Sequence, residues 1–135
     1  MLKLLWRNRY LLQRKYVSWK IIRELTQMMH FGRQKGTVVT RYLDISFYRY
    51  FGTSDEWYGN ARCIIVNYID VKEPYLECGF GVSALITLRF QAERFNQDAI
   101  IIGTHGSLSL QRALIELGYK PRTVDPSTYI LDIRQ

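Results

Sequence analysis

Cysteine, histidine and proline are scarce in this chain of 135 residues, which has two, two and three of them. Cys63 and Cys78 lack the spacing of metal ligands, and His30 and His105 cannot complete a zinc site, so we expect reduced thiols and no metal. No apolar run approaches the roughly 20 residues that cross a bilayer. With 47% hydrophobic and 14% aromatic residues, the sequence predicts a folded, soluble protein without a transmembrane segment, and a cytoplasmic location.

Acidic residues are nearly absent from the first 35 positions, where Glu24 is the one acid among nine Lys and Arg residues. The remaining 100 residues hold ten basic and eleven acidic residues, so the net charge of +7 comes from the N-terminal segment. Such a segment favours an anionic partner, which could be nucleic acid, a membrane surface or an acidic protein, although a solvated helix face would have the same composition. We therefore divide the chain into a basic amphipathic helical segment, residues 1–35, and a domain, residues 36–135.

Apolar residues recur at helical spacing through residues 9–30, which predicts an amphipathic helix or two helices broken near Ser18. Aromatic and basic side chains alternate at its start, from Trp6 to Lys20. Such a pattern can stack bases and bind phosphates. The alternative is that the aromatic residues pack in the core and the basic residues face solvent.

Residues 37–51 are β-branched and aromatic, which predicts one long strand or two short ones. Turn residues follow at 52–60, around Trp57 and Tyr58. Residues 61–71 predict the next strand, antiparallel to the first, and its apolar run 63–66 indicates burial on both faces.

Two glycines, Gly79 and Gly81, lie where this strand gives way to a helical pattern, residues 82–95. Glycine lets backbone amides approach a ligand without a Cβ in the way. These residues also lie at the positive end of the helix dipole, a combination that suits a phosphate group. A tight strand-to-helix turn is the plainer interpretation of the same residues.

The rest of the chain continues the alternation of strands and helices. Residues 98–103 predict a buried strand, joined to the previous one by a right-handed crossover and lying beside it. A loop follows, then a short helix at 108–117 with Ser107 as N-cap and Gly118 as its stop. Two edge strands, 120–124 and 128–133, are predicted at the end of the chain. Together these elements predict the fold class α/β (α+β).

This order of elements, over residues 37–133, resembles the GNAT superfamily of N-acetyltransferases. Val71, Gly79 and Gly81 match that family's V-x-P-x-x-[RQ]-x-x-G-x-[GA] segment, with Pro74 one place late, and Leu117–Lys120 resembles its L-G-F-K end. The resemblance implies a mixed, mostly antiparallel sheet flanked by helices, here with a basic helix at the N-terminus.

The resemblance also implies acetyl-CoA as a substrate. Its pyrophosphate would be bound by amides of the glycine turn, and its pantetheine arm by the backbone of Asp70 and Val71. Ser107 takes the place of an asparagine that is common in the family. The cofactor-binding residues implied in this way are Val71, Cys78, Gly79, Phe80, Gly81, Val82 and Ser107.

The chain departs from the family at several positions. Leu76 replaces the motif's Arg or Gln, and Glu77 adds a negative charge beside it. Leu114 stands where a proton-donating tyrosine is usual, and Ile65 where a glutamate often lies. For attack of an amine on an acetyl thioester, the candidate bases are therefore Asp70, Asp44 and His105, and Tyr119 or Tyr75 could act as the acid. The alternative is a surface or capping role for His105 and packing for the two tyrosines.

Two functions follow from these observations. The first is a protein that binds acetyl-CoA and acetylates an amine, with eroded catalytic positions. The second keeps the fold without the chemistry and serves as a structural or interaction protein, such as a virion-associated phage component, which docks through its basic N-terminal helix. A nucleic-acid-binding module rests on residues 1–35 alone.

Overall fold

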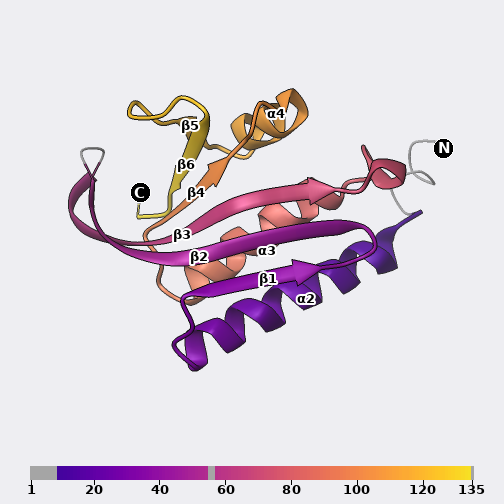
Figure 1. The fold of residues 1–135 in the computed structure, drawn as a ribbon, viewed down its shortest axis with the longest axis horizontal. Coiled ribbons are helices and arrows are strands. Elements are labelled where there is room, and N and C mark those ends of the chain that lie inside the picture. The colour runs from indigo at the N-terminus through magenta and orange to yellow at the C-terminus, as the bar shows by residue number, and fades with distance from the viewer. Residues whose placement is uncertain (1–8, 55–56, 135) are drawn as a thin grey trace.

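The computed structural model describes residues 9–54 and 57–134 of the chain. Lys3, Trp6 and Arg7 of the predicted basic helix lie outside the described residues. The elements are α2 (Leu11–His30), β1 (Lys35–Val39), β2 (Leu43–Ser54), β3 (Trp57–Val71), the 3-10 helix η1 (Glu73–Tyr75), α3 (Phe80–Arg94), β4 (Ala99–Gly103), α4 (Leu108–Glu116), β5 (Lys120–Pro121) and β6 (Thr128–Asp132). The strands form one six-stranded sheet in the order β1-β2-β3-β4-β6-β5 (Figure 1).

Helix α2 is a single helix without a break at Ser18. Its Val17, Ile21, Leu25 and Met28 are all buried, at the spacing that places them on one side of a helix. They belong to the main hydrophobic core, together with buried residues of β2, β3 and α3. Helix α2 is therefore packed into the body of the protein, and burial of each large side chain stabilises the fold by roughly 1.5–3 kcal/mol.

The region 35–54 forms two antiparallel strands, and β3 pairs antiparallel with β2 as predicted. The predicted turn at 52–60 was wrong in its bounds, because β2 continues to Ser54 and β3 already begins at Trp57. A bulge between Ser46 and Phe47 shifts the register of the β2–β3 pair. Strand β4 lies beside β3 and parallel to it, which confirms the predicted neighbours. The C-terminal prediction was wrong in part, because β5 has only two residues and β6 lies between β4 and β5 instead of at the edge.

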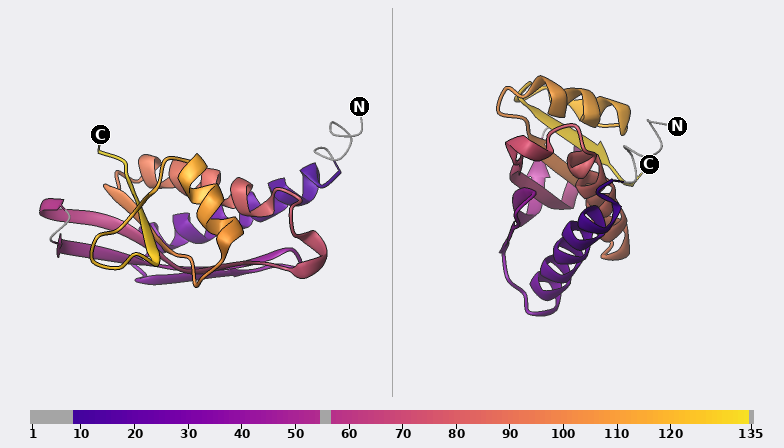
Figure 2. Two further views of the ribbon diagram at one scale, coloured as in Figure 1. Left: turned by 90° about the horizontal axis from the view of Figure 1, so that it is seen from above. Right: turned by 90° about the vertical axis from the view of Figure 1, so that its right-hand side faces the viewer.

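The main core lies on the face of the sheet that α2 and α3 cover (Figure 2). A smaller buried cluster on the other side of the sheet contains Ala61, Cys63, Ala99 and Ile101. Within residues 9–54 and 57–134, no helix has both the length and the hydrophobicity needed to span a membrane.

Candidate functional site

Strands β3 and β4, at the centre of the sheet, separate before β3 ends. Strands β3 and β4 pair from Cys63 and Ala99 as far as Val66 and Ile102, and no β4 residue pairs with residues 67–71. The next carbonyl of β3, at Asn67, bonds to Nε2 of the His105 side chain at 2.7 Å. The parallel strands therefore open into a gap that begins at the bridge between these two residues.

A cleft of about 530 Å³ occupies this gap. Its walls come from the end of β3, the turn before α3, the first residues of α3, the end of β4 and helix α4. The lining residues are Tyr68, Ile69, Asp70, Val71, Tyr75, Leu76, Glu77, Gly79, Phe80, Gly81, Val82, Gly103, Thr104, His105, Ser107, Ser109, Leu110 and Ala113. This volume suits a small-molecule ligand, since such sites span roughly 300–1,000 Å³.

The turn between β3 and α3 contains a short helix and is two residues shorter than the sequence predicted, because α3 begins earlier. The 3-10 helix η1, with Pro74 in its first turn, follows β3, and then Glu77 and Gly79 both adopt positive φ, at 62° and 85°. Helix α3 begins at Phe80 instead of at residue 82. Gly79 is therefore the N-cap, where the left-handed backbone favours glycine, and Gly81 lies inside the first helical turn.

The first turn of α3 presents unpaired amides to the cleft. The first backbone bond of the helix runs from Ser83 N to Gly79 O at 3.0 Å. Among the residues that the structure describes, the amides of Phe80, Gly81 and Val82 have no acceptor and no side chain caps them. A Cβ built on Gly81 would meet nothing closer than Val71 Cγ2 at 3.7 Å. The helix start therefore combines free donors with open space, as an anion site requires.

An aromatic cluster fixes the position of this turn. Phe80 is buried, and its ring stacks on Tyr42 with ring centroids 5.0 Å apart and planes 4° from parallel. Tyr75 packs edge-on to Tyr42 at 4.8 Å, and Tyr10, at the start of α2, packs against both Tyr75 and Phe80. Phe80 thus anchors the helix start in the core while its two glycine neighbours face the cleft.

Arg14 is a residue of this region that the sequence patterns did not reveal. Its Nη1 donates to the carbonyl of Cys78 at 3.0 Å, and its Cδ lies 3.4 Å from the place that a Cβ on Gly79 would take. Helix α2 therefore brings a positive charge to the glycine turn, where the family motif would have had its own Arg or Gln instead of Leu76. Arg14 and Cys78 are 64 positions apart, so no local motif links them.

The structure brings together most of the predicted cofactor-binding residues. Val71, Gly79, Phe80, Gly81, Val82 and Ser107 all line the cleft. Cys78 does not line it, and its amide donates to Tyr75 O at 3.3 Å. The Ser107 hydroxyl accepts a hydrogen bond from Leu110 N at 3.2 Å, which confirms it as the N-cap of α4.

The predicted catalytic residues are divided between the cleft and the core. Asp70 and His105 line the cleft from the two separated strands. Tyr119 is not among the lining residues, being only 3% exposed, and its buried hydroxyl has no hydrogen-bond partner among the described residues. Burial raises the pKa of Tyr119 above its usual range, which makes it a poor proton donor at neutral pH.

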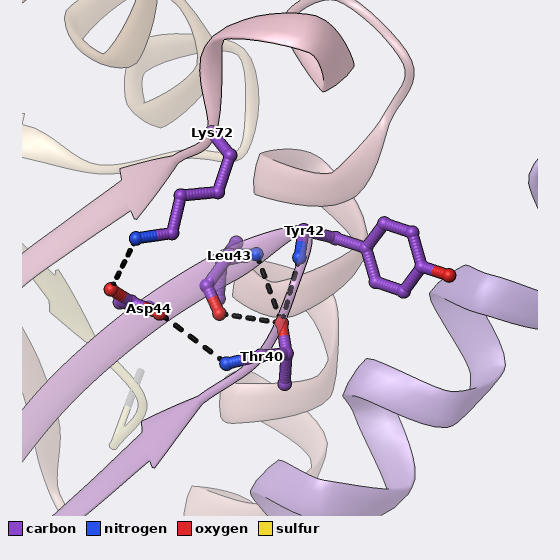
Figure 3. A network of polar contacts seen from close by, with 5 residues as sticks. All are labelled: Thr40, Tyr42, Leu43, Asp44 and Lys72. Carbon is purple, nitrogen blue, oxygen red and sulfur yellow. Dashed lines mark hydrogen bonds and ion pairs between the residues drawn. The ribbon is translucent and has the colours of Figure 1, made fainter.

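Asp44 takes part in a structural network next to the cleft (Figure 3). Its Oδ2 pairs with Lys72 Nζ at 2.6 Å, and its Oδ1 accepts from Thr40 N at 3.3 Å. The Thr40 hydroxyl in turn donates to Leu43 O at 2.7 Å and accepts from the amides of Tyr42 and Leu43. The hydrogen bond to Asp44 raises the pKa of Lys72. Asp44 thus holds the β1–β2 turn against the end of β3, and the cleft has its base candidates elsewhere.

No family model and no curated protein matches the sequence. Among solved structures, the KacTA–DNA complex superposes on 85% of this chain and 78% of its own, with a TM-score of 0.55 and 7% identity. AtaT complexed with acetyl-methionyl-tRNAfMet superposes on 82% of this chain and 78% of its own, with a TM-score of 0.55 and 8% identity. A mutant AtaT toxin bound to the C-terminus of the antitoxin AtaR and acetyl-CoA covers 69%, with a TM-score of 0.52 and 6% identity.

The chain spans 59% of the length of that antitoxin-bound AtaT chain. At these identities the likeness is one of fold. The mixed, mostly antiparallel sheet flanked by helices confirms the GNAT-like architecture that the sequence predicted.

Proposed function

We propose that this protein binds acetyl-CoA in the cleft between β3 and β4 and transfers the acetyl group to an amine. The observation that supports this most is the opening of two parallel strands beside an uncapped, glycine-flanked helix start. One structural neighbour is described as bound to acetyl-CoA, which is consistent with this use of the fold.

Each part of the cleft suits one part of such a ligand. The unpaired amides of Phe80, Gly81 and Val82 would donate to the diphosphate at the positive end of the α3 dipole. The edge of β3 beyond Val66, which β4 leaves unpaired, would pair with the amides of the pantetheine arm, as an added strand pairs with a sheet edge. The thioester would then lie deep in the gap, toward Asn67.

The transfer forms a bond between the amine nitrogen and the acetyl carbon, and it breaks the carbon–sulfur bond, releasing the thiol. The amine must lose a proton, and the departing sulfur must gain one. Asp70 and His105 line the cleft and could accept the amine proton. The bond from His105 Nε2 to a carbonyl requires the proton on Nε2, so Nδ1 bears the lone pair.

Calorimetric titration with acetyl-CoA and with CoA tests binding, and release of free thiol in the presence of an amine panel tests transfer. We expect one ligand per chain and an affinity of at least ~100 μM, in the range of ordinary cofactor sites. Absence of binding at millimolar ligand would refute the proposal. Replacement of His105 by Gln, which can still bond to the Asn67 carbonyl, should lower the transfer rate more than the affinity.

A second candidate is a docking protein without transfer activity. Trp19 is 51% exposed on α2, with Arg23 over its ring at 5.5 Å, and Tyr16 beside it has Lys20 over its ring at 5.8 Å. This exposed aromatic and basic surface suits an anionic partner. Binding of acetyl-CoA without release of free CoA thiol in the presence of any amine tested would favour this candidate. Replacing Trp19 and Arg23 by Ala should then abolish binding of the anionic partner.

A further inference from the structure

A second hollow lies on the other side of the glycine turn, and we call it the outer groove. It has a volume of about 560 Å³ and runs along the first two turns of α3, beside Arg14 of α2. Glu77, Gly79 and Val82 line both the outer groove and the cleft. A ligand that passes over these three residues would therefore have one end in each hollow.

We propose that the outer groove binds the 3′-phosphorylated adenosine end of a CoA-type ligand and that Arg14 contacts its phosphate groups. This inference rests on the proposed function, since it extends the same ligand across the turn. It assigns to the N-terminal helix a part in cofactor binding, in place of the separate docking role that its charge suggested.

The position of Arg14 is the first reason. One guanidinium nitrogen bonds to the carbonyl of Cys78, and the side chain runs alongside Gly79. The positive charge is thus held at the turn, next to the free amides of α3. A guanidinium in this place stabilises phosphate through charge-assisted hydrogen bonds, which are stronger than neutral ones.

The surface of the groove is the second reason. Val82 and Ile86 lie one turn apart on α3 and are 40% and 41% exposed, so they offer an apolar surface on which a purine ring can rest. Beside them, the Thr87 hydroxyl donates to Ser18 Oγ of α2 at 2.9 Å, which ties the two helices together. The groove thus combines a fixed cation with an apolar wall, as a nucleotide requires.

The negative charge of Glu77 makes a nearby positive charge necessary for phosphate binding. It lines both hollows and places a carboxylate where phosphates would lie, which weakens anion binding. Arg14 offsets this charge. Changing Glu77 to Gln should accordingly raise the affinity for CoA several-fold, and more than it raises that for acetyl-pantetheine, which has no diphosphate or nucleotide.

The test compares CoA with 3′-dephospho-CoA by calorimetry, in the full-length protein. We expect the wild type to bind CoA about tenfold more tightly, the effect of one charge-assisted phosphate contact. In Arg14→Gln this ratio should fall to near one. Arg23→Gln removes the same charge from the exposed side of α2 and should keep the ratio. If Arg14 has a purely structural role, Arg14→Gln should lower the affinity for both ligands equally and leave the ratio unchanged. That result would overturn the inference.

The failure of the two proposals can be told apart. If the wild type binds CoA and its 3′-dephospho form equally, the cleft still binds the cofactor and only the outer groove is refuted. If neither ligand binds, both proposals fall. Should Arg14→Gln not fold, Ile86→Glu serves instead, because the side chain is exposed. It should reduce the ratio by repelling the 3′-phosphate, and an unchanged ratio would again count against the outer groove.

Discussion

Helices α3 and α4 both begin at the cleft, but their first turns are built differently. Helix α4 starts with Ser107, whose hydroxyl accepts from Leu110 N and so satisfies one of the free amides. Helix α3 starts with Gly79, which has no side chain to offer, and its first amides have no acceptor among the described residues. A glycine in place of a capping Ser costs only about a few tenths of a kcal/mol, so the fold tolerates an open helix start here. On the proposed function, the open α3 start is the part that binds the ligand, whereas the Ser107 hydroxyl closes the start of α4.

Blocking the α3 start should have the largest effect on ligand binding. Gly81→Glu places a carboxylate at the free amides, and we expect the affinity for acetyl-CoA to fall at least about a hundredfold, because like charges in a binding site cost several kcal/mol. Gly81→Ala is the matched control. Its Cβ would meet Val71 at an ordinary contact distance of 3.7 Å, so titration calorimetry should show an affinity within a few-fold of the wild type. Equal binding by Gly81→Glu would remove the turn from the site.

The sequence predicted the elements well wherever a regular pattern lay within one segment. The apolar face of α2 and the Ser107 cap are of this kind. The alternation of strands and helices also predicted the parallel pair β3–β4. It failed where contacts join distant segments. Nothing near Arg14 signals its bond to Cys78, and the local sequence does not show that Tyr119, a candidate acid, is buried by packing. The sequence also does not show where the gap between the strands begins: β3 and β4 pair as far as Val66 and Ile102, and the His105 side chain contacts the next carbonyl, at Asn67.

The conformation of Gly79 gives a second, smaller contrast. Its φ of 85° is one that side chains with a Cβ rarely adopt, so Gly79→Ala should lower the free energy of unfolding by about 1–2 kcal/mol. Gly81 lies in ordinary helical backbone, where alanine is favoured over glycine. Gly81→Ala should therefore raise the free energy of unfolding by up to about 1 kcal/mol. Urea denaturation measures both values, and equal stability of the two variants would contradict the assigned turn.

Removing the cap of α4 tests the other half of the comparison. Ser107→Ala loses the hydrogen bond to Leu110 N and should lower the free energy of unfolding by about 1 kcal/mol. Ser107→Asp retains a capping oxygen and should remain near the wild-type stability in the same urea titration. If the alanine variant is as stable as the wild type, the hydroxyl does not cap the helix in solution.

The two thiols supply a reporter for the α3 end. Burial raises the pKa of Cys63 to about 11, and since the thiolate is the reactive form, this thiol should stay unreactive at pH 8 until the protein unfolds. Cys78 is partly exposed beside Arg14 in the outer groove and should react with a disulfide reagent in the native state. Acetyl-CoA should slow that reaction, whereas rapid modification of Cys63 in native protein would contradict its burial.

The most direct measurement is the backbone amide NMR spectrum during titration with acetyl-CoA. The account predicts that the largest shifts occur at Phe80, Gly81 and Val82, in the uncapped first turn of α3, while the amide of Leu110, which the Ser107 hydroxyl already holds, moves little. If saturating ligand leaves the NMR signals of the three α3 amides unchanged, or shifts those at the start of α4 instead, the open helix start is not an anion site and the assignment of the cleft is wrong.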